Sequence, residues 1–266
     1  MQEMIIPLLF IIFIVTIAYI SYKSKALSIS GAISSVFVGA SIYFSFGFPG
    51  LVPLGLFFAS SSMISKWKKE RKAQMASILE KGERRDYVQV LANGGIPVLI
   101  SIFNIVDHDD RNFWFILLTI SFACANADTW ASEIGSLSRK KPILLFPPKF
   151  VEKGTSGAVT VLGTFASILG SSFVALGSSF FIKNDAQILP FIILFGFIGA
   201  LIDTLFGCFF QRKNKCLVCH AETEKRIHCG EYTVKTKGFV WMNNDAVNFL
   251  SIFIATVIAY FILDKN

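Results

Sequence analysis

Charged residues are scarce in this chain of 266 residues, because Asp, Glu, Lys and Arg together make up only 16% of it. Soluble globular proteins carry about 25% of these four residues. Apolar residues make up 53% of the chain, and the mean hydropathy is +0.60. The composition therefore excludes the soluble classes and predicts an integral membrane protein.

Two kinds of signature are also missing. The chain has no G-x-x-x-x-G-K-[ST] loop and no H-R-D element, which excludes the P-loop NTPases and the soluble protein kinases. It has no basic run before its first apolar stretch, where Glu3 stands instead, and no small-residue cleavage pattern after it. A secretory signal peptide needs both features. We therefore expect the first apolar stretch to be a helix of the mature protein.

Eight apolar stretches approach the length needed to cross a hydrocarbon layer of about 30 Å at a helical rise of about 1.5 Å per residue. They are residues 4–20, 30–46, 51–65, 87–105, 112–128, 157–181, 188–209 and 246–263. The second and third are short, so one of them could form a re-entrant hairpin around Phe46–Gly50. The sequence predicts a single all-α membrane domain over 1–266, a polytopic helix bundle with about eight transmembrane helices.

Positive charge is concentrated in alternate loops. The first, third, fifth and seventh loops hold 22 of the 25 Lys and Arg residues. The last three of these are predicted at 66–86, 129–156 and 210–245. Short cytoplasmic loops collect Lys and Arg, so the pattern predicts a plasma-membrane protein with both termini outside and a cytoplasmic active face.

The formal charge of +7 does not indicate nucleic acid as a partner. The basic residues stand beside apolar spans rather than on one soluble face, so we expect them to meet lipid headgroups or a phosphorylated substrate. The loop at 66–86 also carries Trp67, Met75, Ile78 and Leu79. This pattern is compatible with an amphipathic segment on the membrane surface and equally with a solvated connector.

Acidic residues lie within or beside the spans at their cytoplasmic ends. An ionisable group in hydrocarbon costs about 3 kcal/mol or more and usually has a function. We interpret Asp128, Glu133 and Asp203 as catalytic. Asp128 and Asp203 are the predicted ligands of Mg²⁺, which prefers oxygen and bridges to substrate phosphates. The alternative is that these groups are helix caps and interhelical hydrogen bonds.

Further polar residues are predicted at the same depth as these acids. The candidates to bind a phosphorylated substrate are Arg85, Gln89, Asn93, Asn126, Lys153, Thr155, Ser156, Asn244, Asp245 and Asn248. Lys153–Gly157 is expected to lead directly into the sixth span, where free backbone N–H groups could contact phosphate. Asn93-Gly-Gly95, followed by Pro97, predicts a break or kink in the fourth span beside a polar cavity.

Three of the five cysteines fall in the last cytoplasmic loop, and Cys124 and Cys208 lie in spans. Cytoplasmic thiols are reduced, so disulfides are not expected. Cys216-x-x-Cys219, Cys229 and either His220 or His228 have the spacing of a small zinc knuckle, with ordinary loop thiols as the alternative. We take Cys216, Cys219, His228 and Cys229 as the candidate zinc ligands.

Five segments together resemble the integral membrane proteins grouped as domain of unknown function ninety-two. They are Gly31–Gly39, Gln89–Gly95, Asn126–Gly135, Gly154–Gly157 and Asn244–Asn248, of which Ala-Asp-Thr-Trp-Ala-Ser-Glu at 127–133 is the most specific. Plant members of this family include a chloroplast phytyl-phosphate kinase that uses a nucleoside triphosphate. The resemblance implies that Asn126, Asp128, Glu133 and Asp203 hold metal and nucleotide phosphates. It also implies that Lys153, Thr155 and Ser156 touch phosphate.

The resulting hypothesis is a lipid-phosphate kinase that transfers a phosphoryl group from a CTP-like nucleoside triphosphate to a prenyl monophosphate. Mg²⁺ is the expected cofactor, and membrane lipid, prenyl phosphate and nucleotide are the expected partners. An ion-coupled transporter or lipid flippase is the alternative, but it favours polar residues throughout the bilayer and an inverted repeat. Neither feature is visible in the sequence. A scaffold role does not account for acids gathered at one side.

Overall fold

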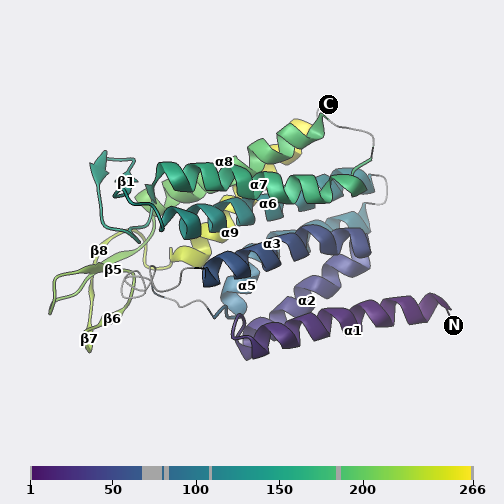
Figure 1. Cartoon of the computed structure of the whole chain (residues 1–266), viewed down its shortest axis with the longest axis horizontal. Helices are drawn as coiled ribbons and strands as arrows, with labels where there is room; N and C mark the ends of the chain where they lie inside the picture. Colours follow the sequence, from purple (N-terminus) through teal and green to yellow (C-terminus); the bar gives the residue numbers. More distant parts are fainter. Residues whose placement is uncertain (1, 68–79, 81–83, 108–109, 184–186, 265–266) are drawn as a thin grey trace.

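The computed structural model describes residues 2–67, 80, 84–107, 110–183 and 187–264, and the side chains from Ile5 onward (Figure 1). Among them are eight helices long and apolar enough to cross a membrane. These are α1 (Gln2–Lys23), α2 (Ile29–Phe46), α3 (Phe48–Lys66), α5 (Tyr87–Val106), α6 (Arg111–Gly135), α7 (Val161–Ser178), α8 (Ile188–Phe209) and α9 (Asn244–Leu263). The prediction of a polytopic helix bundle is confirmed.

The turn between α2 and α3, where the sequence allowed a re-entrant hairpin, joins two helices that are each long and apolar enough to cross a membrane. Helix α2 ends at Phe46, and α3 begins at Phe48. The one residue between them, Gly47, has φ +66°, a conformation that glycine adopts without steric cost. Pro49 stands in the first turn of α3, where its missing N–H leaves no helix bond unmade. Both helices have 18 or more residues and pass the criteria for a span.

Helix α6 forms the centre of the bundle, and α1 lies at its edge (Figure 1). Every residue of α6 from Trp114 to Ala127 is buried, against α3, α5, α7, α8 and α9. Small residues on its neighbours allow this close approach. A Cβ at Gly199 of α8 would lie 2.5 Å from the Cys124 sulfur, and one at Gly170 of α7 would lie 3.0 Å from the Asn126 carbonyl oxygen. Exposed apolar residues cover the outside of α1, as expected for a helix facing lipid.

The fifth span is longer than the sequence predicted, because α6 continues past residue 128 to Gly135. The hydroxyls of Thr129 and Ser132 bond to the carbonyls of Ala125 and Thr129, at 2.9 and 3.1 Å, and so stay within the helix. The expected loop at 129–156 therefore begins only at Ser136. This correction places Asp128 and Glu133 on one rigid helix.

The predicted break in the fourth span is also wrong. Helix α5 runs without interruption through Asn93-Gly-Gly95 and Pro97. The glycines permit close packing instead, since a Cβ at Gly94 would lie 3.0 Å from Val38 and one at Gly95 would lie 3.1 Å from Phe249. The candidate amphipathic segment within 66–86 lies mostly outside the described residues.

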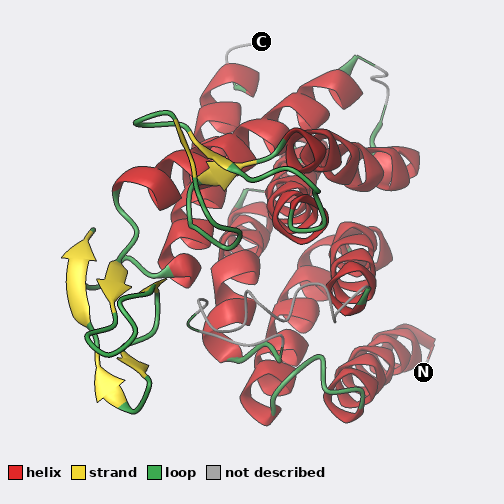
Figure 2. Ribbon diagram, turned by 60° about the vertical axis from the view of Figure 1, so that its left-hand side comes forward, coloured by secondary structure: helices red, strands yellow, loops and turns green. Residues whose placement is uncertain are grey.

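Short strands, which the sequence did not predict, form at one end of the bundle (Figures 1 and 2). Between α6 and α7, β1 (Ile143–Leu144) pairs antiparallel with β2 (Lys149–Phe150) and β3 (Ala158–Val159). Between α8 and α9, β4 (Lys213–Lys215) pairs with β5 (Glu222–Thr223) and β8 (Val234–Lys237). A second hairpin joins β6 (Ile227–His228) to β7 (Glu231–Tyr232). We call residues 211–237 the ribbon.

Helices α1, α3, α6 and α8 end at the end of the bundle that carries the strands, and α1 begins and α9 ends at the opposite end (Figure 1). This agrees with an even number of spans. We call the first end the strand end, and it is the end from which the four predicted basic loops start.

Candidate functional site

A cavity of about 410 Å³ opens at the strand end of the bundle. It is bounded by α5, α6, α7, α8, α9, the turn at 153–157 and the ribbon. Most of the residues chosen from the sequence line it: Arg85, Gln89, Asn93, Asp128, Glu133, Lys153, Thr155, Ser156, Asp203, Asn244, Asp245 and Asn248. Residues up to 163 positions apart in sequence therefore meet in one polar chamber.

Two carboxyl groups meet at the base of this cavity. Asp128 of α6 and Asp203 of α8 are within side-chain hydrogen-bonding distance of each other. Helix α9 supplies the partners of Asp203: the Ser251 hydroxyl donates to its Oδ2 at 3.3 Å, and the Asn248 amide nitrogen donates to the same oxygen at 3.0 Å. Two neighbouring carboxylates repel each other unless they share a proton or have a positive charge beside them. The pair is thus a suitable binding site for a cation.

A second group of polar contacts involves Glu133 and Arg85. The Ser65 hydroxyl of α3 donates to Glu133 Oε1 at 2.7 Å. Arg85 interacts electrostatically with Glu133, and its guanidinium lies 5.7 Å from the ring centre of Phe57. Burial lowers the pKa of Arg85 from its ordinary value, and Glu133 opposes that change. Arg85 is a fixed cation at the cavity wall, held by a ring on one side and an acid on the other.

The start of α5 is fixed by a capping box. Asp86 accepts a bond from the Gln89 backbone N–H at 2.9 Å, and the Gln89 side-chain oxygen accepts one from the Asp86 N–H at 3.1 Å. The Asn93 amide donates to the Gln89 carbonyl at 3.1 Å. This local bonding fixes where Arg85, Gln89 and Asn93 stand in the cavity wall.

The Gly-rich turn reaches the cavity but does not begin a helix, which corrects the prediction. Strand β3 follows the turn, and α7 starts only at Val161, with its N-terminus capped by Thr160. The Lys153 ammonium donates to the carbonyls of Ser136 and Ser138 at 3.1 and 2.6 Å. Lys153 therefore ties the turn to the end of α6, and the helix N-terminus expected to bind phosphate is not formed by Gly154–Gly157.

Asn126 is the one residue of the predicted cavity set that the structure places elsewhere. It is fully buried. Its side-chain oxygen accepts a bond from the Ser60 hydroxyl at 2.9 Å, and its amide nitrogen donates to the Gly170 carbonyl at 2.8 Å. Asn126 joins α3, α6 and α7, which is the structural alternative considered for this polar set.

The ribbon adds residues that the sequence did not mark. The Glu224 carboxylate accepts bonds from the Ser156 hydroxyl and from the Gln211 amide, the latter at 2.8 Å. Lys213 donates to the Ser156 carbonyl at 3.0 Å. Burial raises the pKa of Glu224 above its ordinary value. No local pattern could have identified Glu224, because its position depends on how the ribbon folds back over the cavity.

The cavity is acidic. Its described lining includes six carboxylic acids and two basic residues, Arg85 and Lys153. The acids are Glu80, Asp128, Glu133, Asp203, Glu224 and Asp245. Arg85 faces Glu133, and Lys153 is bonded to two carbonyls. An anionic ligand would therefore be repelled here unless it entered together with a cation.

An apolar cavity of about 140 Å³ adjoins the polar one. Its walls are mainly apolar residues of α1, α2, α3 and α5, such as Phe13, Val38 and Leu54. Arg85, Gln89 and Asn93 line both cavities. The two cavities therefore lie next to each other, and Arg85 is part of the wall of both.

The candidate zinc ligands lie outside both cavities. Cys216, Cys219, His228 and Cys229 come together in the ribbon, with their ligand atoms within 4.8 Å of one another. His220 does not belong to this cluster. The sequence allowed either His220 or His228 as the fourth ligand, and the structure places His228 beside the three cysteines.

Comparison with known proteins agrees with this architecture. The family described as "Integral membrane protein DUF92" matches residues 12–256. "Protein PGR" of Arabidopsis thaliana is 32% identical over 263 residues, which cover 90% of each chain. An uncharacterized membrane protein of Methanocaldococcus jannaschii is 34% identical over 214 residues, covering 80% of this chain and 87% of the relative. "Protein VTE6, chloroplastic" of Arabidopsis thaliana is 26% identical over 236 residues, covering 88% and 64%. No solved structure matches.

Proposed function

Since this chain belongs to the DUF92 family of integral membrane proteins, we propose that it is a lipid-phosphate kinase. It transfers a phosphoryl group from a CTP-like nucleoside triphosphate to a prenyl monophosphate at the cytoplasmic face. The observation that supports this most directly is the pair of neighbouring cavities, one acidic and one apolar, whose walls share Arg85, Gln89 and Asn93. A prenyl phosphate has the same division into a charged head and an apolar tail.

The acidity of the polar cavity supports a metal-dependent reaction. Asp128 and Asp203 offer adjacent carboxylate oxygens, which are the ligands that Mg²⁺ prefers. When bound, Mg²⁺ would be held by these two acids and would neutralise the charge of the nucleotide phosphates. Asn248 and Ser251 hold Asp203 in place from α9. The four side chains fit a cation site built on three rigid helices.

The proposed reaction needs positioning more than acid–base chemistry. A non-bridging oxygen of the prenyl monophosphate attacks the γ-phosphorus of the nucleotide, and the bond from that phosphorus to the β–γ bridging oxygen breaks. A prenyl diphosphate and a nucleoside diphosphate result. The attacking phosphate oxygen is already anionic, so no strong general base is required. The residues of the cavity therefore bind and align two anions.

Arg85 is the residue proposed to position the head of the lipid. Arg85 lines both the polar and the apolar cavity, and two phenylalanine rings, Phe57 and Phe58, lie beside its guanidinium. A guanidinium can donate two parallel hydrogen bonds to a phosphate. The tail would then extend among α1, α2, α3 and α5.

The first test is an assay of the detergent-purified protein with Mg²⁺, labelled CTP or ATP, and a panel of prenyl monophosphates. Labelled prenyl diphosphate is the expected product. Asp128→Asn should remove it, whereas Glu152→Gln should not. Glu152 is an exposed acid at the same end of the molecule, paired with Lys141 at 2.6 Å, and it does not line the cavity. Full activity in Asp128→Asn would contradict the proposal.

A second test addresses the tail. Gly55 of α3 lines the apolar cavity, and a Cβ placed there meets nothing within 4 Å. Gly55→Phe should therefore fold and reduce the space for the tail. We expect a higher KM for the prenyl phosphate and an unchanged KM for the nucleotide, with Gly55→Ala close to wild type. An equal rise in both KM values would argue against tail binding in this cavity.

A transporter would behave differently in the same preparation. Reconstituted into liposomes, it would move an ion or lipid without nucleotide, and the assay above would give no product. That combination of results would replace the kinase proposal.

A further inference from the structure

We propose that Cys216, Cys219, His228 and Cys229 bind a structural zinc ion that holds the ribbon over the polar cavity. The His228 Nδ1 atom lies 3.4 Å from the Cys219 sulfur and 3.2 Å from the Cys229 sulfur. All four ligand atoms are within 4.8 Å of one another. A tetrahedral zinc site with Zn–S of about 2.3 Å and Zn–N of about 2.0–2.1 Å keeps its ligand atoms about 3.5–3.8 Å apart. The observed cluster needs only small adjustments to reach this geometry.

Two hairpin turns bring the ligands together. Residues 216–221 connect β4 to β5, and the Cys216 N–H bonds to the Ala221 carbonyl at 3.0 Å. Within this turn, backbone N–H groups of Val218 and Cys219 point at the Cys216 sulfur. Such bonds stabilise a thiolate, which is the form that binds a metal. The turn thus directs two backbone N–H groups at the sulfur of a proposed zinc ligand.

The second turn places a cysteine in the left-handed backbone conformation, which is unfavourable for this residue. Cys229 and Gly230 form the two-residue loop between β6 and β7, with φ +54° and +83°. Two-residue hairpin loops with positive φ at both positions favour Asn-Gly or Asp-Gly. Cysteine in the first position is strained by comparison. A requirement for its sulfur as a ligand explains why the turn uses Cys229.

The ribbon has little apolar core to hold it together. Its strands are two to four residues long. Its large apolar side chains are turned outward, with Leu217 61%, Ile227 53% and Tyr232 76% exposed. Apart from Cys216, its buried residues are polar: Gln211, Arg212, Asn214, Thr223 and Glu224. Units of this size without a core commonly depend on a metal or disulfides.

The chemistry of the ligands favours zinc. Three thiols and one imidazole form a closed set of four soft or borderline donors, as in structural zinc sites. A disulfide between two of the cysteines would leave the third thiol and His228 without a role. A hard cation such as Mg²⁺ would need oxygen ligands instead. This site is therefore separate in chemistry and position from the proposed magnesium site.

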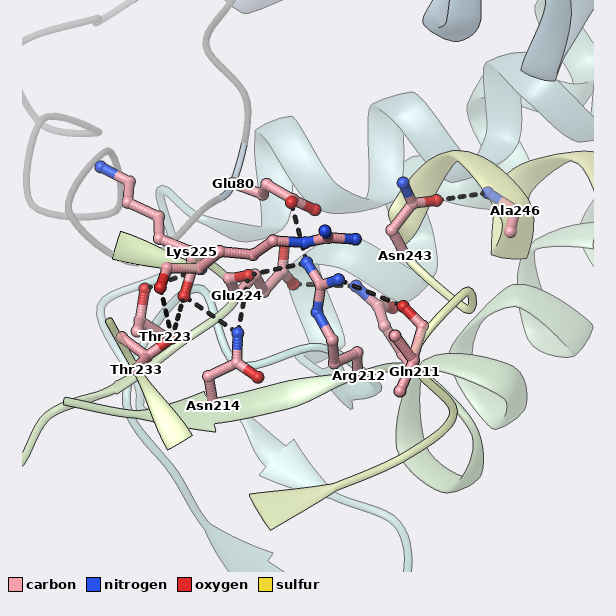
Figure 3. A network of polar contacts seen from close by, with 12 residues as sticks. Glu80, Gln211, Arg212, Asn214, Thr223, Glu224, Lys225, Thr233, Asn243 and Ala246 are labelled. Carbon is pink, nitrogen blue, oxygen red and sulfur yellow. Dashed lines mark hydrogen bonds and ion pairs between the residues drawn. The ribbon is translucent and has the colours of Figure 1, made fainter. Parts of the chain in front are cut away.

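Strand β4, which leads into the turn with Cys216, takes part in a polar network with Glu224 and Glu80, two residues that line the cavity (Figure 3). The Asn214 amide on β4 donates to the carbonyls of Glu224 and Lys225, at 3.3 and 2.9 Å. Arg212 donates to the Glu224 carbonyl at 3.2 Å and to Glu80 at 2.8 Å. The Glu224 side chain then meets Ser156 and Gln211 at the cavity. Loss of the metal would loosen the β4–β5 hairpin and with it the position of Glu224.

The test is the metal content of the full-length protein, purified in detergent from cells grown with zinc. We expect one zinc per chain, and Co²⁺ substitution should give the ligand-field and thiolate charge-transfer bands of a tetrahedral site. His228→Asn should lose the metal, and His220→Asn should keep it. His220 is a matched control in the same ribbon, because asparagine tolerates its φ of +59°.

Two results would overturn the proposal. One is wild-type protein that contains no zinc and gives no Co²⁺ spectrum, a measurement that does not depend on any variant folding. The other is a disulfide among the three ribbon cysteines in that protein, found by thiol labelling before and after reduction. Neither result depends on the kinase assay, so failure here is distinguishable from failure of the proposed function.

Discussion

The polar cavity and the ribbon both bury polar groups, but they hold them in different ways. The cavity takes Asp128, Asp203 and Asn248 from three long helices whose packing fixes the backbone. The ribbon supplies Asn214 from β4 and Glu224 from the residue that follows β5, and in our proposal both depend on hydrogen bonds and on zinc. This difference predicts whether a substitution affects turnover or folding. Changes to the cavity acids on the helices should lower turnover without unfolding the protein. Changes to the ribbon should first disrupt the folding of the ribbon.

The largest expected effect is on the carboxyl pair. Asp128→Asn and Asp203→Asn should each reduce turnover by about 100-fold or more, as expected for loss of a group that stabilises the transition state. The double variant should be little worse than either single variant, because residues acting as one unit are not additive. The thermal midpoint in detergent should stay near that of the wild type. Multiplied single effects in the double variant would show that the two acids act independently.

A change where the Gly-rich turn packs against the end of α8 should affect folding instead. Gly157 has φ +77°, and a Cβ there would lie 2.2 Å from the Cys208 nitrogen at the end of α8. Gly157→Ala should destabilise the protein by about 1–3 kcal/mol, measured as a lower thermal midpoint. Gly55→Ala is the matched control, since its Cβ meets nothing within 4 Å. An unchanged midpoint in Gly157→Ala would show that α8 and the turn separate easily.

Asn126→Ala tests whether this buried amide stabilises the helix packing or takes part in the site. It removes the bonds to Ser60 and Gly170 and leaves their buried groups without this partner. The expected loss of stability is about 1–3 kcal/mol. Activity per folded molecule should remain within a few-fold of the wild type, because Asn126 does not line the cavity. A 100-fold loss of activity at unchanged stability would show that Asn126 has a role in the reaction.

The smallest expected effect concerns pH. Burial raises the pKa of Glu224 in the folded protein. An acid with a raised folded pKa contributes stability at low pH, and this contribution is lost as the pH rises through that pKa. The wild type should therefore lose stability on going from about pH 4 upward, and Glu224→Gln should lose less. Thermal midpoints over a pH series measure this, and parallel curves for the two proteins would contradict the assignment.

Much of the cavity could be predicted because membrane insertion limits where polar residues can stand. Asp203 is conspicuous in an apolar span, and the loop charges predict which helix ends lie together. Asn126 was misassigned because its amide finds partners on α3 and α7, which only helix packing brings close. The end of α6 was misplaced because Thr129 and Ser132 resemble loop residues but bond within the helix.

The membrane location, the eight helices and the gathering of the acids toward one end of the bundle were determined by the sequence alone, since hydropathy and charge act residue by residue against a solvent of fixed thickness. Only the tertiary structure decided that Asp128 meets Asp203 and that Glu224 reaches Ser156. It also decided that His228, rather than His220, faces three cysteines. These contacts depend on helix rotation and strand register, which are set by packing between distant segments.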